Sequence, residues 1–292
     1  MKRFFAGAAA ALLAAVLLFI PAKAVSAEKA YVLDAVSGRV LFEKNADAQS
    51  LIASTTKIMT ALIVCEQCNV LDRMRIPKEA VGIEGSSMYL KEGEELALET
   101  LLYGLMLCSG NDAAVAIASC VGGSGLEGVS NFVDMMNAKA RSLGLTSTHF
   151  TNSTGLHNEE HYSTCREMAA IMAYALDNTL ARRILLSTET KSFKAYKGNT
   201  DEKTVTYYAS PDWYQTDGGT RFKGNVKLET VTVKGGKTGY TDEAGVCLVS
   251  YAESNSTGKC YINVIVGKPK GSGVLESVST ADVKCIYNTY AE

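Results

Sequence analysis

Clusters of positive charge are absent from this 292-residue chain, whose formal net charge is −2. Without a run or stripe of lysine and arginine, the chain lacks the electrostatic footprint of a nucleic-acid-binding protein. A substrate that carries an anionic group must instead meet a few individually placed cations. Internal repeats and low-complexity segments are absent as well, and only four prolines are present. The length therefore favours one well-buried core, in one or two lobes.

The signatures of several common sites are also missing. The three histidines, His149, His157 and His161, fall within one loop-like stretch, and no HExxH pattern occurs, which favours a surface loop over a zinc site. No G-x-S-x-G nucleophile elbow is present. Gly235-Gly236-Lys237-Thr238 resembles the end of a phosphate-binding loop, but that motif requires a glycine where Val231 stands. We therefore expect no metal and no cofactor.

The N-terminus carries the one long apolar run. Two basic residues precede an apolar stretch over residues 4–20, and small residues follow it, ending in Val25-Ser26-Ala27. This order is typical of a secretory signal peptide, residues 1–27, that is cleaved after Ala27. Ala22-Lys23-Ala24 offers a second cut, and an uncleaved membrane anchor is the alternative. We expect residues 28–292 to form one exported domain without a lasting membrane anchor.

Cysteine is plentiful by contrast. Eight cysteines in an exported chain invite a disulfide interpretation, but they are dispersed and the chain is not small, so the sequence does not decide their pairing. Cys65 and Cys68 form a C-x-x-C pair without the second ligand pair that a zinc site needs. The cysteines therefore indicate no metal or redox centre.

The hydrophobic pattern changes along the chain from strand to helix and back to strand. Two extended runs on either side of Gly38, residues 31–34 and 39–42, predict a β-hairpin, because glycine permits the positive φ of a tight turn. Helices are predicted over residues 54–70, 96–121 (as two helices), 126–143, 164–176 and 274–290. Strands are predicted over residues 192–196, 204–208, 230–233, 246–251 and 261–266, and a long loop over 208–225. Strands at both ends predict an α+β domain whose N-terminal hairpin joins a C-terminal antiparallel sheet.

Three short motifs stand in order on this frame. Ser54-Thr55-Thr56-Lys57 opens the first helical run, Ser109-Gly110-Asn111 interrupts the second, and Lys237-Thr238-Gly239 closes a strand. Taken one at a time, a helix-capping serine, a turn and an exposed edge strand explain them better. Together and in this order, they indicate a catalytic site.

The first motif supplies a nucleophile and a base. Serine is a poor nucleophile at neutral pH unless a base lies within hydrogen-bond reach. A spacing of three residues places Lys57 one helical turn from Ser54 on the same face. If Ser54 begins the helix, its N–H is an unpaired donor for an oxyanion, and the positive helix end disfavours a charged lysine.

The other two motifs supply the remaining groups for acyl transfer. A second cation, Lys237, lowers the pKa of the first motif's lysine and, with the Thr238 hydroxyl, can bind a carboxylate. Gly239 has no side chain, so a substrate backbone can lie against this strand. Ser109 and Asn111 offer a hydroxyl for proton relay and an amide that orients the lysine or the substrate.

At these residues the chain resembles the low-molecular-mass penicillin-binding proteins, the serine-type D-alanyl-D-alanine carboxypeptidases. The resemblance covers nearly the whole exported chain and includes further patterns: Asp34-x-x-x-Gly38-x-Val40-Leu41, Gly85-Ser86-Ser87-Met88, Thr148-His149-Phe150-x-Asn152-x-x-Gly155-Leu156, and Tyr240-Thr241 followed by Ala244-Gly245. It implies a β-lactamase/transpeptidase-like fold, in which helices and a helical lobe flank an antiparallel sheet.

The resemblance also implies the reaction and the residue roles. A peptidoglycan stem peptide ending in D-Ala-D-Ala acylates Ser54 and releases the terminal D-Ala; water then hydrolyses the acyl-enzyme, and β-lactams acylate the same serine. The other implied site residues are Lys57 as base, Ser109 and Asn111 as relay and positioning groups, Lys237 and Thr238 as a carboxylate clamp beside Gly239, and Tyr240, whose N–H completes the oxyanion hole with that of Ser54. The implied location is outside the cytoplasm, at the cell wall.

Two other functions remain open. A serine β-lactamase of class A gains rapid deacylation from a water held by a glutamate, and no glutamate in this sequence can be assigned to that task. A wall-binding protein of the same fold without turnover is the non-enzymatic alternative, against which the intact motifs argue.

Overall fold

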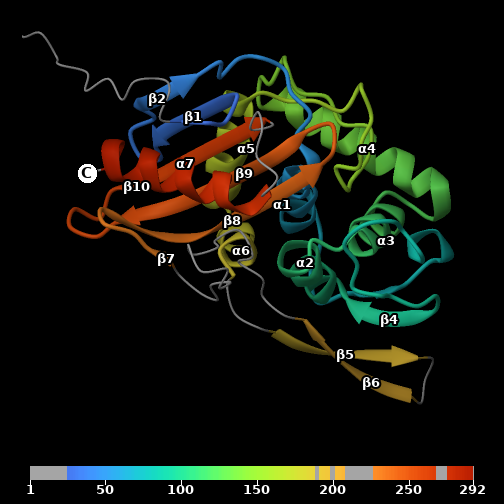
Figure 1. Cartoon of the computed structure of the whole chain (residues 1–292). Coiled ribbons are helices and arrows are strands. Elements are labelled where there is room, and N and C mark those ends of the chain that lie inside the picture. Colours follow the sequence, from blue (N-terminus) through green and yellow to red (C-terminus); the bar gives the residue numbers. More distant parts are fainter. Residues whose placement is uncertain (1–24, 188–190, 198–200, 208–225, 268–274, 292) are drawn as a thin grey trace, which may run out of the picture.

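The structure is a computed structural model that describes residues 25–187, 191–197, 201–207, 226–267 and 275–291, with side chains over 25–187, 227–267 and 281–291. Its framework is a six-stranded antiparallel sheet with the order β2-β1-β10-β9-β8-β7 (Figure 1). The strands are β1 (Lys29–Asp34), β2 (Val40–Lys44), β7 (Val226–Lys227), β8 (Val231–Thr241), β9 (Gly245–Ser254) and β10 (Cys260–Gly267). The predicted loop over 208–225 lies outside the described residues.

The N-terminal hairpin joins the C-terminal strands as predicted. Gly38 has a φ of +71° in the turn between β1 and β2, and its N–H donates to the Asp34 carbonyl at 2.9 Å. β1 pairs with β10 in antiparallel register, with Lys29 opposite Val266. Strands from the first and last parts of the described chain therefore lie side by side in one sheet.

The helices fill the middle of the chain. They are a 3₁₀ turn (Ala53–Thr56), α1 (Lys57–Gln67), α2 (Leu98–Leu107), α3 (Asn111–Val121), α4 (Gly125–Ser142), α5 (Cys165–Asp177), α6 (Thr179–Leu185) and α7 (Leu275–Tyr290). The division of the second helical run at Ser109-Gly110 is confirmed. The prediction was wrong at the start of that run, because residues 94–97 extend as a strand before α2, and it missed α6.

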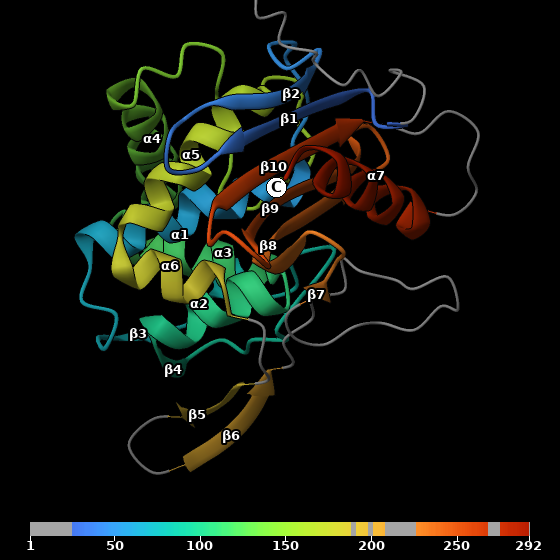
Figure 2. The same ribbon diagram turned by 90° about the vertical axis from the view of Figure 1, so that its left-hand side faces the viewer.

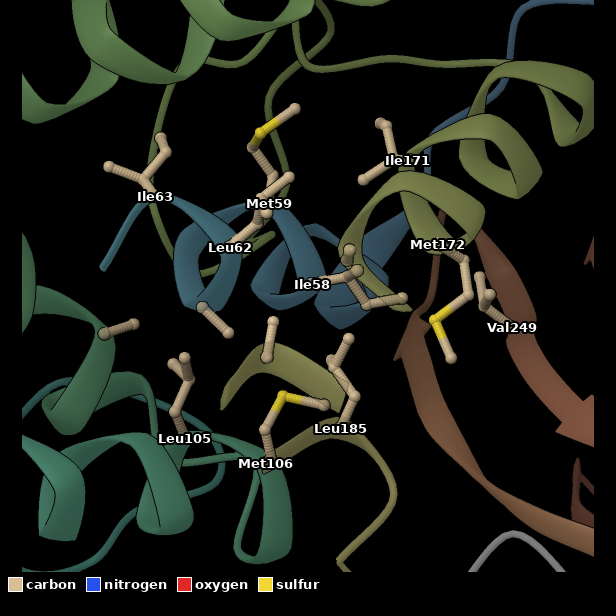
Figure 3. Close-up of a cluster of buried hydrophobic side chains, with 14 of the residues drawn as sticks. Ile58, Met59, Leu62, Ile63, Leu105, Met106, Ile171, Met172, Leu185 and Val249 are labelled. Atoms are coloured by element: carbon tan, nitrogen blue, oxygen red, sulfur yellow. The ribbon is translucent and has the colours of Figure 1, made fainter. Parts of the chain in front are cut away.

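Two layers of helix enclose the sheet (Figure 2). α7 covers one face over a small apolar core, and the other helices cover the opposite face over the main core. α1 lies at the centre of the main core and is buried from Lys57 to Cys65. Figure 3 shows its apolar side chains surrounded by those of α2, α5 and β9. Lys57 thus belongs to the part of α1 that is enclosed by the main core.

A second, four-stranded sheet lies beyond α2, with the order β3-β4-β5-β6. Its strands are β3 (Arg73–Arg75), β4 (Glu94–Ala97), β5 (Lys191–Lys197) and β6 (Asp201–Tyr207). The sequence pattern predicted β5 and β6 but not β3 and β4, which are only three and four residues long. β5 and β6 form a hairpin that lies apart from the six-stranded sheet (Figure 1).

Residues 25–27 are integrated into the fold. Val25 and Ala27 are buried, and the Ser26 N–H, the Ser26 hydroxyl and the Ala27 N–H all donate to the buried Asp282 carboxylate at 2.7–2.9 Å. Lys44 Nζ donates to the carbonyls of Val25 and Ala27. Within the described part of the chain, no single helix is long and apolar enough to cross a membrane. α3 and α4 meet these two criteria only when taken together, and they are bent by 92° relative to each other.

Candidate active site

Ser54 lies in the 3₁₀ turn that leads into α1. The preceding residue, Ala53, has a φ of +45°, a conformation that L-residues rarely adopt. The two threonines of the motif hold this turn, since Thr55 Oγ1 donates to the Ile52 carbonyl at 2.6 Å and Thr56 Oγ1 to the Ala53 carbonyl at 2.8 Å. The strained turn leaves Ser54 half-buried while Lys57 is fully buried.

Lys57 Nζ meets three oxygens within hydrogen-bond distance. They are Ser54 Oγ at 2.9 Å, Asn111 Oδ1 at 2.7 Å and the Thr154 carbonyl at 2.6 Å. The amide oxygen and the carbonyl can only accept, so they take two N–H groups of the amine. In a neutral amine the remaining position is a lone pair, and it faces the Ser54 hydroxyl. The arrangement therefore aims a base at the predicted nucleophile.

The surroundings of Lys57 favour its neutral form. Burial lowers its pKa well below the ordinary value of 10.5, the charge of Lys237 lowers it further, and Asp112 acts weakly in the other direction. Lys237 thus acts on this pKa in the direction that the sequence predicts. Lys237 itself is buried, and its Nζ donates to the Thr238 carbonyl at 2.7 Å.

Asn111 begins α3 and is held by hydrogen bonds from both its side chain and its backbone. Its Nδ2 donates to the Glu84 carbonyl at 2.7 Å, and its backbone N–H donates to the Ser86 carbonyl at 2.7 Å. Between these two carbonyls lies Gly85, with a φ of +82°, where a Cβ would come within 2.8 Å of Asn111 Nδ2. The Gly85-Ser86 pattern thus has a physical reason, because it turns the Asn111 oxygen toward Lys57.

The segment after Phe150 contributes Thr154 to the site, a residue that the sequence did not reveal. Asn152 Oδ1 accepts from the Thr154 N–H at 3.1 Å, the Thr154 hydroxyl at 2.9 Å and the Gly155 N–H at 2.7 Å. This turn presents the Thr154 carbonyl to Lys57. Gly155 has a φ of +84°, and a Cβ there would lie 2.0 Å from the Ala53 carbonyl oxygen. The Asn-x-x-Gly spacing was a clue, but a backbone carbonyl carries no sequence signature of its own.

The third motif approaches the nucleophile along β8. A Cβ on Gly239 would lie 2.7 Å from the Ser54 nitrogen, so only glycine lets the strand come this close. Tyr240 follows it with its side chain 45% exposed and its hydroxyl donating to Asp242 at 2.8 Å. The Tyr240 side chain therefore lies at the edge of the site, not within it.

Ser109 lies in the turn between α2 and α3, two residues before Asn111, and is half-buried. Its φ of +53° is again a left-handed conformation that serine rarely adopts. Strained backbone of this kind clusters at functional sites. The structure thus places one left-handed non-glycine residue, Ala53, directly before the first motif and another, Ser109, at the start of the second.

The interpretation of the histidines as a surface loop was wrong for His161. His157 is exposed and His149 half-buried, but His161 is only 2% exposed. Its Nε2 lies 2.7 Å from the hydroxyl of Thr56, inside the first motif. His161 directly follows an exposed segment, residues 157–160, so the sequence gives no sign that the chain becomes buried at this residue.

The described residues contain no group of three or more histidine, cysteine or acidic side chains arranged to hold a metal ion. Burial raises the pKa of the thiols of Cys65, Cys165 and Cys247 to about 12. These thiols are protonated at neutral pH and act as small core side chains.

Residues 19–270 match the model of peptidase family S11, D-alanyl-D-alanine carboxypeptidase. The chain belongs to this family. It is 35% identical over 244 residues to a D-alanyl-D-alanine carboxypeptidase of Bacillus subtilis, covering 79% of this chain but 55% of that one. It is 34% identical over 252 residues to the D-alanyl-D-alanine carboxypeptidase of Streptomyces strain K15, covering 83% and 81%. This chain thus spans about half of the first relative and most of the second.

Solved structures confirm the fold of this S11 family member. The crystal structure of the Streptomyces K15 DD-transpeptidase superposes with a TM-score of 0.75 at 28% identity, covering 90% of this chain and 96% of that one. The D-alanyl-D-alanine carboxypeptidase DacD from Francisella tularensis superposes with a TM-score of 0.70 at 25% identity. The predicted family and the predicted transpeptidase-like fold are both confirmed.

Proposed function

We propose that this protein is a serine-type D-alanyl-D-alanine carboxypeptidase that removes the terminal D-Ala from peptidoglycan stem peptides outside the cytoplasm. The observation that carries the proposal is the triple contact of Lys57, which points the lone pair of a buried amine at Ser54. Family membership supplies the substrate class, and the predicted leader supplies the compartment.

Acylation begins with proton transfer from Ser54 Oγ to the neutral amine of Lys57. The oxygen attacks the carbonyl carbon of the penultimate D-Ala, and the oxyanion is stabilised by the N–H groups of Ser54 and Tyr240. The C–N bond to the terminal D-Ala then breaks, and the leaving nitrogen takes up the proton through the Ser109 hydroxyl. An ester on Ser54 and a free D-Ala result.

Substrate binding in this scheme depends on β8. Lys237 and the Thr238 hydroxyl bind the terminal carboxylate as a charge-assisted pair. The peptide backbone lies against the strand beside Gly239, where no side chain intervenes. Asn111 holds Lys57 through its amide oxygen. In the second half of the reaction, water attacks the ester, Lys57 accepts its proton, and Ser54 Oγ regains a proton as the leaving group.

The test uses the exported protein with two substrates, a diacyl-L-Lys-D-Ala-D-Ala peptide and a β-lactam. Release of D-Ala together with a long-lived β-lactam adduct supports the proposal. Rapid β-lactam turnover without D-Ala release identifies a β-lactamase, and inertness toward both identifies a wall-binding protein. Because the structurally similar Streptomyces K15 protein is a DD-transpeptidase, a third reaction includes an amine acceptor such as glycine. Formation of a new peptide bond then reports transfer in addition to hydrolysis.

A further inference from the structure

His161 is buried beside the first motif, yet the proposed reaction gives it no task. Two polar neighbours face its ring. The Thr151 N–H lies 3.1 Å from Nδ1, and Thr56 Oγ1 lies 2.7 Å from Nε2. A third contact, from Thr151 Oγ1 to Nδ1, is longer at 3.3 Å.

These neighbours determine which ring nitrogen carries the proton. A backbone N–H can only donate, so Nδ1 accepts and the neutral ring carries its proton on Nε2. Nε2–H then donates to Thr56 Oγ1, and the Thr56 hydroxyl donates its own hydrogen to the Ala53 carbonyl at 2.8 Å. The hydrogen bonds therefore run in one direction, from Thr151 through His161 and Thr56 to Ala53.

The last acceptor of this series is the carbonyl of the strained peptide before Ser54. Ala53 has a φ of +45°, and its carbonyl shares a peptide plane with the Ser54 N–H. Gly155 packs closely against the same carbonyl, since a Cβ on Gly155 would lie 2.0 Å from its oxygen. Whatever fixes the Ala53 carbonyl thus fixes the N–H that we assign to the oxyanion hole, and with it the Cα that carries the nucleophile.

We propose that His161 is a positioning residue for Ser54, acting through the Thr56 hydroxyl on the peptide between Ala53 and Ser54. The proposal rests on the proposed function, since it gives the rigidity of that peptide a catalytic purpose. A protonated ring would present an N–H at Nδ1 toward the Thr151 N–H, so only the neutral ring completes the series. Burial lowers the pKa of this ring and so favours its neutral form.

The competing explanation is a histidine that merely fills the core. The ring does pack edge-on against Phe150, with centroids 5.6 Å apart. A core-filling role predicts that activity follows stability in every substitution. A positioning role predicts that activity follows the bond to Thr56, whatever the stability.

Three substitutions separate these explanations. His161→Gln places an amide N–H near the position of Nε2–H and keeps the bond to Thr56; His161→Asn is too short to reach Thr56; His161→Leu keeps neither bond. The readouts are the second-order rate of acylation by a fluorescent penicillin and the melting temperature of each variant. We expect His161→Gln to acylate close to the wild-type rate and the other two about tenfold more slowly, the equivalent of one lost hydrogen bond.

Thr56 supplies the matched control. Thr56→Val removes the hydroxyl with little change of shape, and Thr56→Ser retains it. We expect Thr56→Val to slow acylation as His161→Leu does, the double variant to be no slower than either single one, and Thr56→Ser to retain the rate.

Equal acylation rates in folded His161→Gln and His161→Leu, or rate losses that multiply in the double variant, would overturn the proposal. A wild-type protein that reacts with no penicillin would instead overturn the proposed function itself, so the two failures are distinct.

Discussion

At the residue scale, the ionisation of Lys57 links the geometry of the site to its chemistry. None of the three oxygens that contact its Nζ belongs to a carboxylate, and the charge with the larger effect on its pKa is another cation, Lys237. Burial and like charge both lower the pKa of an amine. A lysine that is an ammonium in most proteins is therefore available as a base in this one.

The role of Lys237 in this tuning can be measured from the pH dependence of acylation. The rate of acylation rises with pH as Lys57 loses its proton. We expect the midpoint of this rising limb of the pH–rate profile to lie well below pH 10.5 in the wild type. Lys237→Gln removes the positive charge that lowers the Lys57 pKa, so the limb moves to higher pH. Lys237→Arg retains the charge and serves as the control, with a limb near that of the wild type. An unmoved limb in Lys237→Gln would show that Lys237 does not tune the base.

His161 leads to a prediction on stability. Burial lowers its pKa from the ordinary 6.5 to about 4. Between these two values the unfolded chain binds a proton that the folded chain does not, so the free energy of unfolding falls as the pH drops from 6.5 to 4 and is level below. The loss amounts to roughly 3 kcal/mol at most. Urea unfolding at pH 7 and pH 4 should show this loss in the wild type, reduced in His161→Gln; equal losses in both proteins would contradict the assignment.

At the element scale, the turn from Asn152 to Gly155 connects the base to the nucleophile. It presents the Thr154 carbonyl to Lys57 and lies against the Ala53 carbonyl through Gly155. One turn thus contacts both of the proposed catalytic residues through its backbone alone.

Gly155→Ala tests this turn, and Gly144→Ala is a matched control. Both glycines have positive φ, +84° and +74°, so alanine is strained at either position. Only Gly155 also meets the backbone, at 2.0 Å, whereas nothing lies within 4 Å of a Cβ on Gly144. We expect Gly144→Ala to cost about 1 kcal/mol and to leave acylation unchanged, and Gly155→Ala to cost more and to slow acylation at least tenfold. Identical acylation rates in the two variants would contradict the account.

The elements that could be predicted from the sequence are those whose signal is local. The hairpin at Gly38 and the break before Asn111 depend on residues whose conformational preferences act within a few positions. The sequence predicted those parts of the site that consist of side chains: Lys57 Nζ does contact the side chains of Ser54 and Asn111. It did not predict the contact with the Thr154 carbonyl, because every residue has a backbone carbonyl. His161 was misjudged because its burial depends on packing against Phe150, on a segment remote from Thr56.

At the scale of the whole molecule, the segment before β1 bears on where the predicted signal peptide would be cut. Ser26 and Ala27 satisfy the Asp282 carboxylate, which is 2% exposed, and Lys44 binds the carbonyls of Val25 and Ala27. A cut after Ala27 would remove all of these partners and leave a buried carboxylate without them, which is costly. The contacts therefore favour the second predicted cut, after Ala24.

We expect N-terminal sequencing of the exported protein to begin at Val25. A chain that starts at Glu28 should melt at a lower temperature than one that starts at Val25, and Asp282→Asn should destabilise the longer chain more than the shorter one. A mature protein that begins at Glu28 and is as stable as the longer form would contradict this expectation.

The three motifs are brought together by segments that lie far apart in the sequence. The main core encloses α1. β8 is held in the six-stranded sheet, which also contains the N-terminal strands β1 and β2. The Asn111 side chain donates to the Glu84 carbonyl, next to Gly85. Residues more than 180 positions apart in sequence, such as Ser54 and Gly239, come into contact only when this fold is complete.

The most direct test of the central claim is to locate the acyl group. The wild-type protein is treated with a β-lactam, digested, and mapped by mass spectrometry, with Ser54→Ala treated in parallel. We expect one adduct in the wild-type protein, on the peptide that contains Ser54, and none in Ser54→Ala. An adduct on any other residue of the wild type, or the same adduct persisting in Ser54→Ala, would contradict it.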